Sequence, residues 1–155
     1  MEELFDITLQ TRKTLHGHLL NTPKEDLFKI PKGFNNNIWW NIAHVVVTEQ
    51  LLVYKLSGES VNMPEEIIEK YRKGTFPEGI PSDEEIDLIS SLMFSLPEQT
   101  ANDYEKGIFK DFKPYMTSAK IELKSVEDAI VYNTYHEGIH LGSVLALKRA
   151  LSAES

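Results

Sequence analysis

Apolar residues recur at steps of three and four in four long segments of the chain, the spacing of helices that each bury one face. The first segment spans residues 3–20, and Arg12 is a polar member of its otherwise apolar stripe. The second begins near Asn37 and ends before Gly58, a residue type that commonly follows the C-terminus of a helix. Both segments are therefore predicted to be long helices.

The other two long segments begin with residues typical of helix N-termini. Ser82 and Glu85 form a capping-box pair, and apolar residues continue at helical spacing as far as Pro97. Proline lacks the backbone N–H that a helix interior needs, so Pro97 is expected to kink or end this third helix. Ser125 resembles another N-cap, and a fourth helix is predicted from residue 126 to about residue 151.

The connections between these segments also carry local signals. Thr22, with the proline after it, predicts a short helical turn capped by its side chain, and PEEIIEKY predicts another at residues 64–71. The link over residues 59–81 is long enough for the second and third helices to run parallel. Residues 108–123 are expected to be irregular or weakly extended. The pattern as a whole predicts one all-α domain over residues 1–155, a four-helix bundle with a long connection between helices two and three.

Composition narrows the classes of protein to which the chain can belong. Hydrophobic residues make up 41% and charged residues 26% of the 155 residues, as in soluble globular proteins. No apolar run approaches the roughly 20 residues of a membrane span. The acidic, amphipathic start MEELFDITLQ is unlike a signal or transit peptide, so a cytoplasmic location with no membrane partner is expected.

Cysteine usage and net charge exclude further kinds of chemistry. The sequence contains no cysteine, so thiolate ligands, disulfides and a cysteine nucleophile are all absent. The net charge of −8 and the lack of any basic cluster argue against nucleic acid as a partner, because phosphate backbones would be repelled. Any binding of a soft metal must therefore use histidine.

The sequence YHEGIHLG places two histidines one helical turn apart in the fourth predicted helix. Because residues at i and i+4 share a face, the two imidazoles can reach the same ion. That face is the apolar stripe expected to point into the bundle, formed by Ala129, Asn133, His136, His140, Val144 and Leu147.

The second predicted helix carries a further histidine among apolar neighbours, His44 in NIAHVVV. Together with His136 and His140 it would complete a three-histidine site for one divalent metal ion, with zinc and nickel the foremost choices. The alternative is that these histidines are hydrogen-bonded core residues without a metal.

The segment HEGIH also satisfies the HExxH pattern of zinc proteases, in which the glutamate serves as general base. The metzincin continuation with a third histidine is missing after His140, and Glu154 near the C-terminus is a poor replacement ligand. No sheet edge is visible that would hold a peptide substrate. The protease interpretation is therefore the less favoured one.

The phrases NNNIWWNIAHVV and YHEGIHLGSV, with FKPYMTSAKIEL before the last helix, resemble the DinB/YfiT superfamily of four-helix bundles. In that family one ligand histidine comes from the second helix, and an HxxxH pair, commonly followed by glycine, comes from the last helix. The matching positions here are His44, His136 and His140, with Gly142 two residues further on. The resemblance covers nearly the whole chain.

The resemblance implies a metal-dependent enzyme acting on a small molecule, because some members are S-transferases that use low-molecular-weight thiols. The metal would lower the pKa of a bound thiol or water, so thiol transfer and hydrolysis are both open. Glu137 would accept a proton in the reaction or orient a ligand, or would instead be exposed to solvent, and Asn41 and Asn133 would line the substrate pocket. The alternative is a non-catalytic metal- or ligand-binding bundle that acts as an interaction module. A homodimer is expected, formed through an exposed apolar face.

Overall fold

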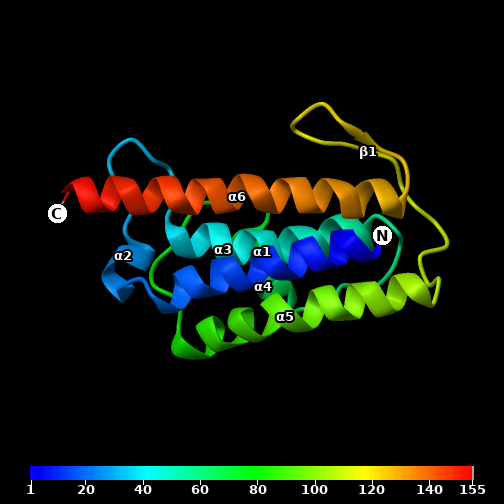
Figure 1. Ribbon diagram of the computed structural model, residues 1–155, viewed down its shortest axis with the longest axis horizontal. Coiled ribbons are helices and arrows are strands. Elements are labelled where there is room, and N and C mark those ends of the chain that lie inside the picture. The colour runs from blue at the N-terminus through cyan, green and yellow to red at the C-terminus, as the bar shows by residue number, and fades with distance from the viewer. Residues whose placement is uncertain (155) are drawn as a thin grey trace.

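The computed structural model describes residues 1–154 and shows a mostly helical chain (Figure 1). Its α-helices are α1 (Glu2–Leu20), α2 (Lys24–Phe28), α3 (Ile38–Gln50), α4 (Glu65–Tyr71), α5 (Asp83–Glu105) and α6 (Val126–Glu154). A short π-helix, η1 (Leu51–Lys55), continues α3 directly. Strands β1 (Tyr115–Met116) and β2 (Glu122–Leu123) pair antiparallel in a small hairpin before α6.

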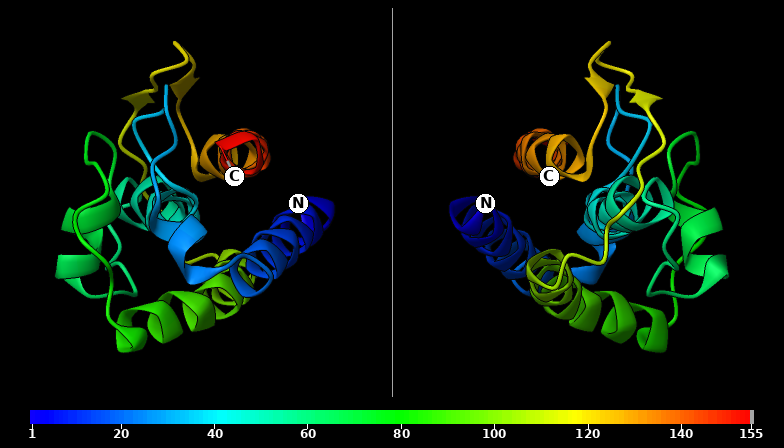
Figure 2. Two further views of the ribbon diagram at one scale, coloured as in Figure 1. Left: turned by 90° about the vertical axis from the view of Figure 1, so that its left-hand side faces the viewer. Right: turned by 90° about the vertical axis from the view of Figure 1, so that its right-hand side faces the viewer.

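The four long helices, α1, α3, α5 and α6, lie side by side (Figures 1 and 2). The colour gradient of Figure 1 shows that α1 and α6 run in one direction and that α3 and α5 run in the other. Helix α3 contacts each of the other three long helices and also α4. The prediction of a mostly helical fold is confirmed, and the second and third long helices are parallel as expected. The described chain has six α-helices where the bundle prediction had four, because the two expected helical turns form α2 and α4.

Side-chain caps mark the residues at which α3 and α5 begin. The Asn37 side chain accepts a hydrogen bond from the backbone N–H of Trp40 at 2.8 Å and so starts α3. Ser82 accepts one from Glu85 N–H at 3.2 Å and starts α5, as the capping pair predicted. The predicted cap at Thr22 is wrong, because Pro23 occupies the N-cap position of α2 and no side chain caps that helix.

Helix α5 continues through Pro97 as far as Glu105. This proline was expected to kink or end the helix. It does not end it, because Pro97 lies buried within α5. Helix α3 instead changes its winding after Gln50, where η1 adds one wider turn. Gly58 follows with a φ of +76°, a left-handed conformation that suits glycine and ends the helix as predicted. Single π-turns within helices are frequent at functional sites.

The interior is built mainly from α3, whose side chains are buried along most of its length. Trp39 and Trp40 are 2% and 7% exposed, so both are core residues. The Trp39 indole N–H donates to the Tyr71 hydroxyl at 2.7 Å, which fastens α4 to α3. Within residues 1–154, no helix combines the length and the apolar character that crossing a membrane requires.

Candidate metal centre

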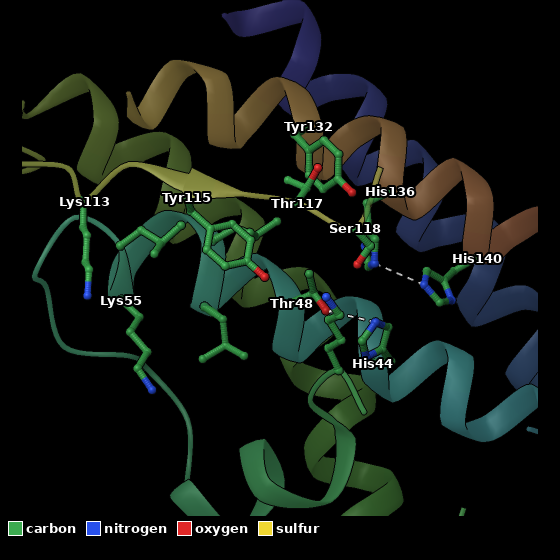
Figure 3. Close-up of a pocket in the computed structure, with 14 residues that line it drawn as sticks. His44, Thr48, Lys55, Lys113, Tyr115, Thr117, Ser118, Tyr132, His136 and His140 are labelled. Carbon is green, nitrogen blue, oxygen red and sulfur yellow. Dashed lines mark hydrogen bonds between the residues drawn. The ribbon is translucent and has the colours of Figure 1, made fainter. Parts of the chain in front are cut away.

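Three histidines, one from α3 and two from α6, come together where these two helices lie next to each other (Figure 3). His44 comes from α3, and His136 and His140 come from successive turns of α6. The Nε2 atoms of His136 and His140 are 3.1 Å apart, and one nitrogen from each of the three rings lies within 4.8 Å of the others. The Trp40 indole stacks on the His44 ring, with the ring centres 4.5 Å apart and the planes at 11°. The predicted set of histidines thus comes together as a group that could hold a metal ion.

Hydrogen bonds on the far side of two rings determine which nitrogens face the group. The Nδ1 atom of His44 lies 2.6 Å from the backbone oxygen of Tyr71, and Nδ1 of His140 lies 2.7 Å from Oδ1 of Asn41. A carbonyl oxygen accepts only, so each Nδ1 carries the proton and each Nε2 keeps a free electron pair. Asn41 is itself oriented, because its amide donates to the Asn37 backbone oxygen at 2.8 Å.

The surroundings of the three rings favour neutral imidazoles, the form that binds metals. Burial and the neighbouring histidines lower the pKa of His136 to about 2, and burial and His44 lower the pKa of His140 to about 3. Burial also lowers the pKa of His44, although its bond to the Tyr71 carbonyl acts in the opposite direction. All three rings are therefore neutral at neutral pH, and their free electron pairs can bind a cation.

The donor set fits a divalent transition metal. Three neutral imidazoles are the ligands of catalytic zinc sites that leave one coordination position open, with Zn–N distances of about 2.0–2.1 Å. The Nδ1 atom of His136 is buried and has no hydrogen-bond partner among the described residues, unlike Nδ1 of the other two histidines. A buried imidazole nitrogen without a hydrogen-bond partner costs free energy, whereas a bound metal ion would give the three rings a function at this position.

A cavity of about 570 Å³ opens beside the three rings. All three histidines line it, and Thr48 places its hydroxyl 3.3 Å from Nε2 of His44 (Figure 3). The rest of the wall comes from η1 and the residue after it, from Lys73 beyond α4, from the segment around β1 and from α6. Any ion held by the histidines would therefore face space of the size that small-molecule sites occupy.

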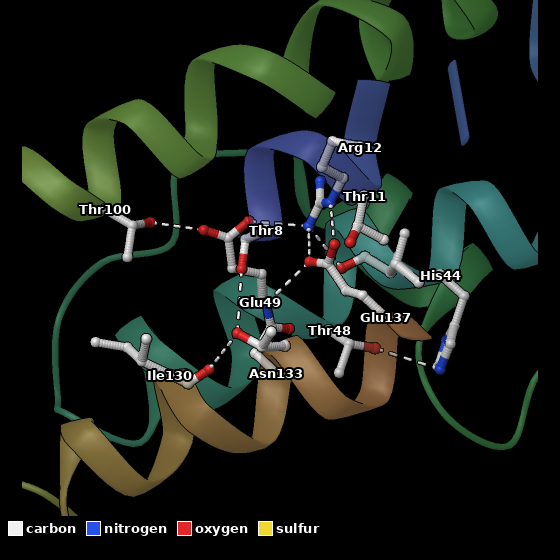
Figure 4. Close-up of polar contacts among 12 residues, drawn as sticks. Thr8, Thr11, Arg12, His44, Thr48, Glu49, Thr100, Ile130, Asn133 and Glu137 are labelled. Atoms are coloured by element: carbon white, nitrogen blue, oxygen red, sulfur yellow. Dashed lines mark hydrogen bonds and ion pairs between the residues drawn. The ribbon is translucent and has the colours of Figure 1, made fainter. Parts of the chain in front are cut away.

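Glu137 lies elsewhere, although it follows His136 in the sequence. Its carboxylate accepts hydrogen bonds from Nε and Nη2 of Arg12 at 2.9 and 2.7 Å, and it is 0% exposed (Figure 4). Arg12 also pairs with Glu49 at 3.0 Å. We call Arg12, Glu49 and Glu137 the buried charge cluster. Glu137 does not line the cavity, so neither the expected catalytic role nor the general-base role of a zinc protease agrees with this placement.

The charges of this cluster depend on one another. Burial opposes a charge on Arg12, but the carboxylates of Glu137 and Glu49 outweigh it and raise the pKa of the guanidinium. Burial raises the pKa of Glu49, whose other oxygen accepts a hydrogen bond from Thr100 at 2.7 Å. Arg12 and Glu137 thus form an ion pair with two hydrogen bonds, and burial favours the protonated form of Glu49.

The two asparagines expected in the substrate pocket are both buried behind it. Asn41 is 1% exposed and orients His140, and Asn133 is 3% exposed and donates to Glu137 at 2.9 Å. Neither lines the cavity. Asn41 is therefore placed to hold a candidate metal ligand, and Asn133 belongs with the buried charge cluster.

Sequence reasoning missed the partners of these groups. Arg12 stands in the apolar stripe of the first helix, and Glu137 continues the buried series of α6 at Ile130 and Asn133. Opposite charges at core positions of two helices were the available signal for their ion pair. No such signal pointed to the backbone oxygen of Tyr71 as the partner of His44. Every residue has a backbone carbonyl, and which one meets a side chain depends only on how the chain folds.

A family model described as the DinB superfamily matches residues 7–144. The match covers most of the chain, and the chain belongs to this superfamily. No curated protein sequence matches it closely enough to count as a relative.

Proposed function

We propose that this member of the DinB superfamily is an enzyme that uses one divalent metal ion, zinc or nickel, held by His44, His136 and His140. Its substrate is a small molecule, and the reaction is transfer to or from a low-molecular-weight thiol, with hydrolysis as the neighbouring activity. In this proposal the four long helices act as a bundle that places one ligand on α3 and two on α6.

One observation carries the proposal: the three imidazoles open onto a cavity of about 570 Å³. A structural metal site is closed by protein ligands, whereas a catalytic site keeps a position for water or substrate. The described residues offer three ligands here and space in front of them. This arrangement favours an enzyme over a bundle whose metal serves stability alone.

A divalent ion in this position supplies a Lewis acid that lowers the pKa of a coordinated thiol or water. The chain itself orients the rings through Asn41 and the Tyr71 carbonyl and keeps them neutral by burial. The Thr48 hydroxyl, 3.3 Å from His44 Nε2, can hydrogen-bond to a group bound there. None of the described residues that line the cavity is a carboxylate, so the protein wall offers no carboxylate base.

In a transfer reaction the thiol sulfur forms a bond to an electrophilic carbon, and the leaving group departs with the electron pair of the broken bond. The proton of the thiol is released to water, since no carboxylate of the described wall can take it. An external thiol also agrees with a chain that has no cysteine.

The test is whether a thiol reaches a metal in this site. Protein loaded with Co²⁺ and titrated with 2-mercaptoethanol is expected to gain a sulfur-to-cobalt charge-transfer band. The band is expected to be absent from His136→Ala and present in His16→Ala, a matched control whose histidine lies outside the group. Cobalt bound by wild-type protein without any thiol band would contradict thiol transfer and leave hydrolysis as the activity to assay. No cobalt binding at all would contradict the metal site itself.

A further inference from the structure

We propose that the cavity beside the histidines binds a small amphipathic anion, with its carboxylate or phosphate at Lys55 and Lys113 and its apolar body between these lysines and the histidines. The inference rests on the proposed function only for the reacting end of the molecule, which would face the histidines. The lysine end has its own evidence and its own test.

The first evidence is the sign of the charges around the cavity. Its charged wall residues are Lys55, Lys73 and Lys113, and none of the described wall residues is acidic. The whole chain has 24 acidic and 16 basic residues. A wall whose charged residues are all lysines is therefore opposite in charge to the protein as a whole. Such a local field draws in anions and repels cations.

The second evidence is that these lysines are not neutralised by the protein. Other lysines form close ion pairs, for example Lys24 with Asp83 at 2.7 Å. Among residues 1–154, no carboxylate lies within 4.0 Å of the ammonium groups of the three cavity lysines, the limit that defines the ion pairs found elsewhere. Their charges remain available to a ligand.

The third evidence is where two of them lie. Figure 3 shows Lys55 and Lys113 on one side of Tyr115, with the histidines on the other side. Lys55 is the last residue of η1, and the backbone N–H of Lys113 donates to the Leu56 oxygen at 2.7 Å. This bond joins the segment before β1 to the residue that follows Lys55. The two lysines therefore share the end of the cavity that is remote from the candidate metal ligands.

Between the two ends the wall is apolar. Leu51, Leu52 and Leu56 line it from η1 and the residue after it, and the rings of Tyr115 and Tyr132 also line the cavity. Besides the tyrosine hydroxyls, the hydroxyl groups of the wall lie near the histidines, at Thr48, Thr117 and Ser118 (Figure 3). A ligand that matches this order has a charged end, an apolar middle and a polar reacting end.

The test compares octanoate, octyl phosphate and 1-octanol, which share one alkyl chain, by calorimetric titration of the full chain. The variants are the double substitution of Lys55→Gln with Lys113→Gln and the control Lys13→Gln, an exposed lysine of α1 outside the cavity. Each titration is run on zinc-loaded and on metal-free protein, with the zinc content of every sample measured.

Wild-type protein is expected to bind at least one of the two anions about tenfold more tightly than octanol, since two partly exposed charge pairs together supply that factor. The double variant is expected to lose this preference while binding octanol as before, and the control is expected to keep it. Added salt is expected to weaken the preference, because the lysines are solvent-accessible. The two anions distinguish a carboxylate ligand from a phosphate ligand.

Equal affinity of wild-type protein for the anions and octanol would overturn the proposal. A preference that survives the double substitution but disappears with the zinc would also overturn it, because the anion would then bind at the metal. A failure of the proposed function has a different signature. Protein that takes up no zinc would refute the metal site, while the comparison on metal-free protein would still decide the role of the lysines.

Discussion

The interior of the molecule holds two polar groups of residues side by side, the three histidines and the buried charge cluster of Arg12, Glu49 and Glu137. In the charge cluster both carboxylate oxygens of Glu49 and of Glu137 accept hydrogen bonds. All three side chains are at most 3% exposed (Figure 4). Nδ1 of His44 and of His140 is hydrogen-bonded to the protein, the inner nitrogens contact, within residues 1–154, only one another and the Thr48 hydroxyl, and all three rings border a cavity. His136 and Glu137 are neighbours in the sequence, yet they belong to different groups.

This difference separates a polar group that holds the fold from one that can bind a ligand. The ion pair is closed to a substrate, because its carboxylate oxygens all accept hydrogen bonds and the one unpaired donor, Nη1 of Arg12, is buried among the described residues. The histidine nitrogens that converge on one point keep free electron pairs that can bind a ligand, and burial keeps these rings neutral. The electrostatic link between the two groups is Arg12, whose charge also lowers the pKa of His136.

The largest expected effect comes from breaking the charge cluster. Arg12→Met leaves the Glu137 carboxylate buried without its partner, and metal-free protein is expected to lose about 3–5 kcal/mol of unfolding free energy. Urea denaturation measures the loss. Lys13→Met is the matched control, because Lys13 is the exposed neighbour of Arg12 on α1. A loss similar to that of the control would show that the cluster does not hold the fold.

Removing a partner of the histidine group should instead affect the metal. Asn41→Ala removes the acceptor that orients His140, and zinc affinity is expected to fall about 10- to 100-fold, as for other residues that position a metal ligand. Asn133→Ala is the contrasting variant, because Asn133 bonds to Glu137 and should leave zinc affinity nearly unchanged. Asn41→Asp retains an acceptor and is expected to recover part of the loss. Titration with a zinc indicator measures all three, and equal effects of Asn41→Ala and Asn133→Ala would remove the distinction between the groups.

The pH dependence of stability should also originate in the histidines. The pKa of His140 is about 3 in the folded protein and about 6.5 in the unfolded chain, so the unfolded chain binds the proton first. Metal-free protein is therefore most stable above about pH 6.5 and loses stability as the pH falls below that value, until the folded pKa is reached. His140→Gln is expected to remove about 1–2 kcal/mol of the loss between pH 7 and pH 5, measured by urea denaturation at each pH. An unchanged slope would show that this ring is not held neutral.

The long helices and the three histidines could be predicted because both follow from residue spacing. Apolar steps of three and four gave the long helices, and the same periodicity placed His136 and His140 on the inward stripe of α6. The position of Glu137 was not predicted correctly, because a residue at the margin of an apolar helix face can point either into the core or away from it. The Glu137 carboxylate points inward because the facing helix places Arg12 opposite it. Such pairing between helices depends on how the helices pack.

The cavity could not be predicted in the same way. Its wall combines η1, the segment around β1 and α6, and the pairing of Lys113 with Leu56 joins residues 57 positions apart in the chain. The change of winding at Leu51 also left no distinct mark, because a helix and a π-turn bury similar apolar residues. Sequence spacing describes one element at a time, whereas a cavity is formed by several.

The measurement that tests the central claim most directly is the metal content of protein purified without affinity-tag histidines or added metal, by inductively coupled plasma mass spectrometry. The account predicts about one zinc, nickel or other divalent transition-metal ion per chain, lost in His44→Ala but retained in His16→Ala. Wild-type protein that contains no metal and takes up neither zinc nor nickel when these are added would contradict it, and the three histidines would then be core residues.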